Sequence, residues 1–305
     1  MQQRSIGISI LFFAANSCVI AASLTTLCAN EIDRFAVLGI RQLIVAFAML
    51  KFYTLTSNYR ALYFPTGRQG LLFLLAFAGQ FICALAYVLS LTFGSVITPL
   101  ILFYVSAPIW RALLGNIFLH EVISRMRLLV LSIAFPIAVL IYFMSDDWGR
   151  PDTFGISLSL TASFGWSVAN LAQDLQKRTD GPAPGQCIHL QALTWSYFCV
   201  ASVGLIFGQG ELPTESNALA LLVTAGLTQG VGLLAYNLGA RKVRTIESVI
   251  IFSTLEPILS PIWAIALVGE TPGVAKLVGA FLMLACVVVP TIVEMRRMDD
   301  SAGDD

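Results

Sequence analysis

The chain has 305 residues, of which 57% are hydrophobic and only 12% are charged. An ordinary soluble domain carries about 25% charged residues, so this composition excludes a water-soluble globular protein of this length. The eighteen basic and eighteen acidic side chains balance each other, and we therefore expect no nucleic acid among the partners.

Taken in chain order, the apolar segments have the length that membrane-spanning helices need. A bilayer core about 30 Å thick is crossed by about 20 mostly apolar helical residues. This rule predicts ten spans, at residues 6–28, 34–54, 69–91, 95–119, 126–143, 154–174, 188–208, 218–239, 247–268 and 272–293. The predicted fold class is therefore all-α and integral to the membrane, with ten transmembrane helices.

The basic residues are distributed unevenly over the connections between these spans. Thirteen Lys and Arg side chains lie at the two chain ends and in every second connection, whereas the opposite connections hold two, Arg34 and Arg150. Loops rich in Lys and Arg stay in the cytoplasm. The sequence therefore predicts a multi-pass protein of the inner (plasma) membrane with both termini in the cytoplasm.

An internal repeat emerges when the chain is shifted against itself by 149 residues, because 71–121 then falls on 220–270 without a gap. The matched pairs include Gln80 with Gln229, Tyr87 with Tyr236, Pro108 with Pro257, and Glu121 with Glu270. Five spans per copy is an odd number, so the second copy must cross the membrane upside down. We expect one five-helix repeat at 1–145, its inverted copy at 146–294, and a polar cytoplasmic tail at 295–305.

Inverted repeats of this kind are common in secondary transporters, whose substrate sites lie near the membrane midplane between the halves. The sequence contains no G-x-x-x-x-G-K-[ST] loop that would bind ATP phosphates. Any transport by this chain would therefore be secondary, or else powered by a partner chain.

Two stretches, YVSAPIWRALLGNIFLHE at 104–121 and STLEPILSPIWAIALVGE at 253–270, resemble the paired signature of the EamA-type drug/metabolite transporters. In that family each half ends with such a helix followed by one last span. Arg41 in the second span and Trp166 in the sixth also resemble the family pattern. The resemblance implies a carrier for small metabolites, such as amino acids or related amphipathic compounds.

The two signature stretches differ at two matched positions, where Ala107 stands opposite Glu256 and Arg111 stands opposite Ser260. Glu256 lies about ten residues into its span, some 14 Å from the cytoplasmic end, which is too deep for a carboxylate to reach water. Intramembrane acids usually face a wet cavity or pair with a base. Glu256 is therefore a candidate to bind a cationic group or a proton, and a purely structural role beside Pro257 is the alternative.

Arg111 lies about 13 Å from the cytoplasmic end of its span, and two interpretations stay open. It could pair with Glu256, so that the two residues close an empty site or bind the two charges of an amino-acid zwitterion. Alternatively, its long stem could reach toward the interface and form a structural ion pair.

Proline removes a backbone donor and bends a helix. Four prolines in the fourth and ninth spans are therefore candidate hinges: Pro99, Pro108, Pro257 and Pro261. Packing alone is the other interpretation, since proline is common in membrane helices.

Polar and aromatic side chains near mid-depth complete the candidate substrate cavity: Gln80, Gln229, Asn16, Trp166, Tyr87 and Tyr236. Helix-to-helix hydrogen bonding and interfacial anchoring are the structural alternatives for them. Glu121 and Glu270 each end a span, and we expect them to cap the helix that follows. Arg41 lies about 10 Å from the outer end of its span, from where it could extend to the interface or steer anions.

These observations predict a secondary transporter that moves a small metabolite by alternating access, with export as the expected direction. Protons are a candidate coupling ion, and a monomer or homodimer in the lipid bilayer is expected. An uptake carrier for a vitamin- or nucleoside-like metabolite, a membrane-embedded enzyme and a lipid flippase stay open as alternatives. An enzyme would need clustered acids or metal ligands, and because no convincing cluster occurs we expect no enzymatic activity, cofactor or metal.

Overall fold

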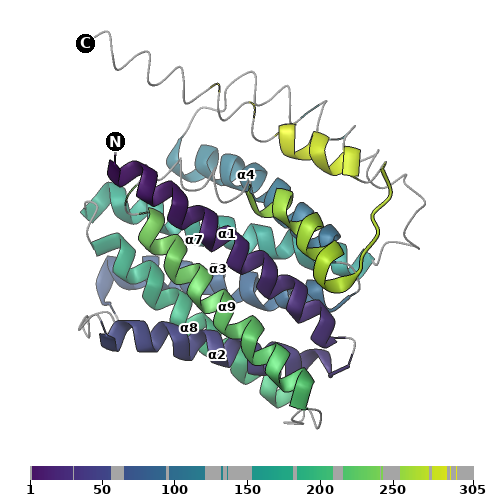
Figure 1. Cartoon of the computed structure of the whole chain (residues 1–305). Helices are drawn as coiled ribbons and strands as arrows, with labels where there is room; N and C mark the ends of the chain where they lie inside the picture. Colours follow the sequence, from purple (N-terminus) through teal and green to yellow (C-terminus); the bar gives the residue numbers. More distant parts are fainter. Residues whose placement is uncertain are drawn as a thin grey trace.

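The computed structural model of the chain describes residues 2–29, 31–55, 65–93, 96–120, 153–180, 184–208, 216–240, 255–274 and 277–286, with a few single residues between them. Within these residues 92% are helical and none belongs to a strand. Figure 1 shows the result as a bundle of long helices that run alongside one another. The predicted all-α class is therefore confirmed for the described part of the chain.

Seven long α-helices and one π-helix are defined: α1 (Gln2–Ala29), α2 (Arg34–Leu55), α3 (Gly67–Leu91), α4 (Ile97–Leu119), α7 (Thr153–Asp180), α8 (Pro184–Phe207), α9 (Ser216–Ala240) and η3 (Ala264–Val268). They match the predicted spans closely, except that α7 continues past the expected end at residue 174. Parts of the ninth and tenth spans are helical at 255–268 and 277–286. The fifth predicted span, 126–143, lies outside the described residues.

Five helices in the described part of the chain are long and apolar enough to cross a membrane: α1, α2, α3, α4 and α9. Shorter apolar helices occur at Gln191–Phe207, Leu255–Val268 and Leu277–Cys286. The length and composition of these helices identify a multi-pass membrane protein.

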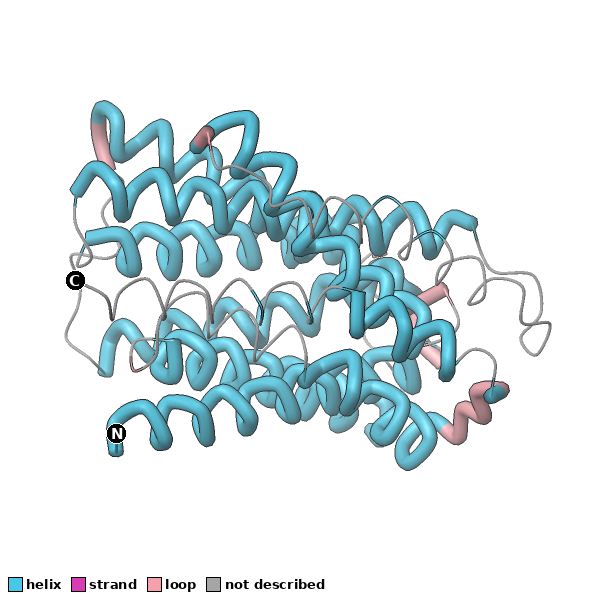
Figure 2. Tube along the Cα trace, turned by 90° about the horizontal axis from the view of Figure 1, so that it is seen from above, coloured by secondary structure: helices cyan, strands magenta, loops and turns pink. Residues whose placement is uncertain are grey.

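The helices pack in antiparallel pairs that join early and late parts of the chain: α1 with α9, α2 with α8, and α3 with α7. Figure 1 shows α1 and α9 next to each other, and Figure 2 shows the helices of the bundle from above. In this pair, Cys28 lies at Ala218 and Cys18 lies at Gly232, so residue numbers rise along one helix and fall along the other.

Glycines allow two of these pairs to approach closely. A side chain on Gly79 of α3 would come within 2.6 Å of the Gly165 carbonyl oxygen on α7, and the reverse holds for Gly165. Between α2 and α8, Gly39 and Gly204 face each other in the same way. Membrane helices lack a hydrophobic driving force toward each other, so small residues at their crossings provide the van der Waals contact that holds them.

Glu270 joins the residues after η3 to the start of α4. Gly269 has φ 75° in the left-handed region and ends η3, which a residue without a β-carbon does at low cost. The Glu270 carboxylate then accepts a hydrogen bond of 2.5 Å from the Val96 amide at the start of α4. Our expectation of a helix cap is confirmed, but this bond caps α4 rather than the following helix. Glu121 lies outside the described residues.

The four prolines fall into different settings. Pro99 lies in the first turn of α4, where an amide has no helical acceptor anyway, so the expected bend at this position is wrong. Pro108 lies in the interior of α4. Pro257 and Pro261 lie in the helical segment 255–263 that leads directly into η3. A π-helix is a local widening that often occurs at functional sites.

Candidate functional site

Glu256 is the most unusual group in the described structure. Its side chain is fully buried, with 0% exposed surface, and neither carboxylate oxygen has a hydrogen-bond partner in the described part of the chain. The flanking Leu255 and Leu259 pack against the main core cluster, which contains residues of α1, α3, α4 and α7. This burial agrees with the depth expected for Glu256 from its position in the ninth span.

Two polar side chains on other helices face Glu256. Cys18, on α1, lies near the carboxyl group, but no hydrogen bond joins its thiol to either carboxylate oxygen. Tyr87, on α3, lies within electrostatic reach of the same carboxyl group. Burying an unpaired polar group is costly, so Glu256, with only these polar neighbours among the described residues, is the strongest candidate for a binding group.

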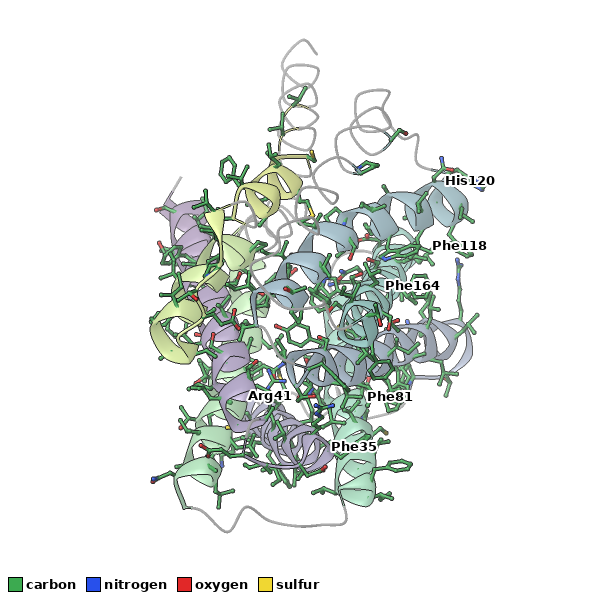
Figure 3. All side chains as sticks on the ribbon, turned by 90° about the vertical axis from the view of Figure 1, so that its right-hand side faces the viewer. Phe35, Arg41, Phe81, Phe118, His120 and Phe164 are labelled. Atoms are coloured by element: carbon green, nitrogen blue, oxygen red, sulfur yellow. The ribbon has the colours of Figure 1, made fainter. Side chains whose placement is uncertain are left out.

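Within the described residues, Arg41 is a second buried charge without a matching partner. It lies on α2, has 0% exposed surface, and its Nε and Nη1 atoms make no hydrogen bond in this part of the chain. Figure 3 shows the side chain in the interior of the bundle. Of the two interpretations of Arg41, extension to the interface is therefore wrong, because neighbouring helices pack over the side chain.

Arg111 pairs with an acid on a different helix from the one that carries Glu256. Its Nη2 atom donates to Oδ2 of Asp174 on α7 at 2.5 Å, and the two side chains are 26% and 25% exposed. Glu256 makes no ion pair in the described part of the chain. The structure therefore supports the structural ion pair for Arg111 and not a direct pair with Glu256.

Three of the predicted aromatic residues form a continuous series of ring contacts with a further ring, that of Phe103. Its ring centroid lies 5.2 Å from that of Tyr87 and 6.3 Å from that of Trp166. Trp166 in turn lies 6.5 Å from Tyr236. These four side chains come from α3, α4, α7 and α9, and we call them the aromatic row.

Asn16 joins α1 to the segment that carries Glu256. Its Nδ2 atom donates to the Phe12 carbonyl at 3.1 Å, and its Oδ1 atom accepts from Trp263 Nε1 at 3.2 Å. Both side chains of the second bond are partly buried. Asn16 therefore holds the helix after Pro257 and Pro261 against α1, two residues before Cys18.

Gln80 and Gln229 are both buried, as predicted from their depth, but they lie at helix crossings and do not belong to the aromatic row. Gln80 follows Gly79 at the crossing with α7. Gln229 lies between Gly226 and Gly230, which pack against α2. Gln80 Nε2 and Gln229 Oε1 make no hydrogen bond in the described residues.

Serine hydroxyls surround the prolines. On α7, Ser163 contacts Ser106 at 2.6 Å and Ser167 donates to the Ala107 carbonyl at 2.9 Å. In the segment that leads into η3, Ser260 donates to the Pro257 carbonyl at 3.1 Å. That carbonyl lies four residues before Pro261, which has no amide to donate to it.

Four residues that build this site carry little signal in the sequence: Asp174, Phe103, Cys18 and Trp263. Asp174 stands at the predicted end of the sixth span, where a polar residue indicates a boundary. The other three are apolar or weakly polar residues in apolar segments, and only the packing of helices distinguishes them. Arg41, in contrast, could be singled out from the sequence, because it lies about 10 Å inside the outer end of its span.

Comparison with known proteins agrees with this fold. Residues 153–291 match the EamA-like transporter family. A solved structure known only as "Crystal structure of protein" is similar at 14% identity, covering 95% of this chain and 98% of that one with a TM-score of 0.64, which shows a shared fold. No match was found among curated proteins.

The helices and the buried charges define a multi-pass membrane protein with a polar interior. The family match covers residues 153–291, less than half of the chain, and shows that this part is similar to the EamA-like transporter family.

Proposed function

We propose that this chain is a secondary carrier that moves a small amphipathic metabolite, such as an amino acid or a related compound, by alternating access. The observation that carries the proposal is Glu256, a fully buried acid without a partner in the described structure. An unpaired ionisable group inside a membrane protein marks a pathway for a substrate or an ion. The aromatic row beside it offers apolar surface for the rest of the molecule.

The packing of the helices supports an inverted repeat of the halves 1–145 and 146–294. Such a repeat makes α1 the counterpart of α7 and α3 the counterpart of α9, so that the pair α1–α9 should recur as α7–α3. Both pairs are present and antiparallel. Gly232 of α9 packs against Cys18, and Cys83, which aligns with Gly232 at a shift of 149 residues, packs against Gly165.

The hinges of the carrier are proposed to lie at Pro108 and at the pair Pro257 and Pro261. The second of these regions leads into η3 and carries Glu256 one residue before the first proline. A change of bend there would move the carboxyl group relative to Cys18 and Tyr87. Movement of one half against the other around a fixed site is the common route to alternating access.

Protons are the proposed coupling ion, with Glu256 as the group that takes up and releases the proton. The groups that face it are the Cys18 thiol and the Tyr87 hydroxyl, and neither is a fixed cation that would hold the carboxyl group ionised. The carrier is further proposed to work as an exporter in the inner membrane, with both termini in the cytoplasm.

Untargeted metabolite profiling tests this function. Cells that express the full chain, cells with an empty vector, and cells that express Glu256→Gln at the same level are compared, and small molecules are measured in cells and medium. An exporter predicts that one class of amphipathic compound rises in the medium and falls in the cells with the wild-type chain alone. Identical profiles in the three cultures would contradict the proposal.

A further inference from the structure

Two helix contacts occupy matched places in the internal repeat. At a shift of 149 residues α4 falls on 246–268, and at a shift of 148 residues the Gly-Ile-Ser stretch 7–9 of α1 falls on the Gly-Ile-Ser stretch 155–157 of α7. The contact between α4 and α7 therefore corresponds to the contact between the segment 255–268 and α1. Both contacts are present in the structure, and we call the second one the α1 seam.

Polar side chains hold the first of these contacts together. Three residues of α7 make hydrogen bonds or an ion pair with α4: Ser163, Ser167 and Asp174. The positions of α1 that match them at a shift of 148 residues are Ala15, Val19 and Thr26. Ala15 and Val19 have no polar side-chain atom, and the Thr26 hydroxyl donates to the Leu91 carbonyl of α3 at 3.0 Å. The α1 seam therefore lacks all three of the polar contacts that join α4 to α7.

Among the described residues, one hydrogen bond crosses the α1 seam. Trp263 Nε1 donates to Asn16 Oδ1 at 3.2 Å, and both side chains are partly buried. Asn16 Nδ2 donates in turn to the Phe12 carbonyl at 3.1 Å, which orients the amide so that its oxygen faces Trp263. Both polar atoms of the amide thus have a partner within the protein. This arrangement favours a role for Asn16 in positioning the segment 255–268 over direct contact with a substrate.

The α1 seam covers the buried acid. Cys18, two residues after Asn16, lies near the Glu256 carboxyl group, and both side chains are buried. The other α1 residues in the same core cluster have small or short apolar side chains: Ala14, Ala15, Val19 and Ala22. Contacts between such side chains are individually weak. Separation of α1 from the segment 255–268 would therefore break one hydrogen bond and open a path for water to Glu256.

The backbone is irregular at the point where this hydrogen bond is made. Trp263 lies two residues after Pro261 and directly before η3. Proline and π-helical turns are the usual places where a helix bends. A change of bend here would carry the Trp263 indole away from Asn16, whereas the matched part of α4 is a regular helix up to Leu119.

Resting on the proposed function, we infer that the α1 seam opens in each transport cycle and that the hydrogen bond from Trp263 to Asn16 keeps it closed between openings. Asn16 is thus a positioning residue that holds the segment carrying Glu256 against α1. The matched contact between α4 and α7 stays closed throughout the cycle.

Alkylation of the native cysteines tests this inference without a substrate. The full chain in reconstituted vesicles is treated with N-ethylmaleimide, and mass spectrometry follows the rate at each cysteine. Cys18 reports on the α1 seam, and Cys28, which faces Ala218 of α9 from the same helix, is the internal control. Trp263→Phe keeps an aromatic ring and removes the donor. It should raise the rate at Cys18 about fivefold, the factor that one neutral hydrogen bond corresponds to, and leave Cys28 unchanged.

Two further variants separate the hydrogen bond from a general loosening of the protein. Asn16→Leu should raise the rate at Cys18 as much as Trp263→Phe, and the double variant should react no faster than either single one, because each removes the same bond. Trp110→Phe in α4 is the matched control, since its indole Nε1 makes no hydrogen bond in the described residues. It should leave Cys18 unchanged. Size-exclusion chromatography checks the folding of each variant.

Cross-linking tests whether opening belongs to the transport cycle. Asn16→Cys and Trp263→Cys are combined and bridged in vesicles with a bifunctional methanethiosulfonate reagent, and mass spectrometry confirms which sulfur atoms are joined. Counterflow of the compound found by metabolite profiling should stop when the bridge forms and return on reduction. The same treatment of Trp110→Cys with Phe164→Cys, whose native rings lie 5.4 Å apart between α4 and α7, should leave counterflow intact.

The outcomes separate this inference from the proposed function. An unchanged rate at Cys18 in both Trp263→Phe and Asn16→Leu would overturn the inference, as would an equal rise at Cys28. Counterflow that persists across a bridged α1 seam would also overturn it and leave the carrier proposal intact. Absence of counterflow in vesicles with the wild-type chain would contradict the carrier proposal itself.

Discussion

The helix α4 and the segment 255–268 are matched by the repeat at 149 residues, yet their charged residues differ in burial and in pairing. In α4 the charged residue is Arg111, partly exposed and paired with Asp174 of α7. In the segment 255–268 it is Glu256, fully buried and without a partner in the described residues. We infer from this contrast that the copy in α4 is a fixed structural contact, or fixed joint, and that the copy at 255–268 is the chemically active element.

The backbones of the two regions also differ, since one is a regular helix and the other is irregular. α4 runs unbroken from Ile97 to Leu119 through Pro108, and serines of α7 bind it just before the proline. The other segment changes from α-helix to π-helix after Pro261. A helix held by a neighbour suits a scaffold, whereas a helix with an irregular turn suits an element that moves.

The largest effect is expected from breaking the crossing that holds α7 beside α3. Gly165→Leu would place a side chain on the backbone of Gly79 and Cys83, and overpacking of this kind costs about 1–3 kcal/mol or more. We expect a clear loss of folded protein in size-exclusion chromatography. Leu160→Ala, at a site 37% exposed on the same helix, is the control. A Gly165→Leu variant as stable as the control would show that the crossing is not close.

A second prediction removes the charge of the active element. Glu256→Gln should reduce transport in vesicles about tenfold or more, because it removes a charged hydrogen bond to substrate. It should also abolish the pH dependence of the remaining rate. Transport is measured across a series of external pH values. A variant that kept both the rate and the pH profile of the wild type would remove Glu256 from the mechanism.

A third prediction concerns the fixed joint. Asp174→Asn should lower the free energy of unfolding by about 1 kcal/mol or less, since the pair with Arg111 is partly exposed. The exchange Arg111→Asp with Asp174→Arg should restore part of the loss. Thermal unfolding of the single and double variants measures the coupling. If the stability lost in the double variant equals the sum of the losses in Arg111→Asp and Asp174→Arg, the pair contributes nothing to stability.

Effects of a similar size, about 1 kcal/mol or less, are expected at the serines beside the prolines. Ser260→Ala leaves the Pro257 carbonyl without its hydroxyl donor and should cost about 1 kcal/mol. Ser167→Ala should cost less, because the Ala107 carbonyl lies in regular α4 and also accepts a helical amide. Thermal unfolding of both variants gives the order. A larger loss of stability in Ser167→Ala would show that the Ser260 hydroxyl does not compensate for the amide that Pro261 lacks.

The helices could be predicted well from the sequence, because span length is set by the bilayer and is visible in composition. The burial of Glu256 also agrees with its position in the middle of a predicted span. The residues that contact the charged side chains could not be predicted. Asp174 resembles the end of a span because polar residues follow it, and the orientation of Arg41 depends on which helices cover it. Such contacts between distant helices leave no pattern in the order of residues.

Counterflow in reconstituted vesicles tests most directly that this chain is a carrier with alternating access. Vesicles are loaded with unlabelled substrate, diluted into medium with a trace of the labelled compound, and sampled over time. A carrier with one site exposed to each side in turn predicts that label accumulates transiently above its equilibrium level. A rise that only approaches equilibrium would indicate an open path and would contradict this mechanism.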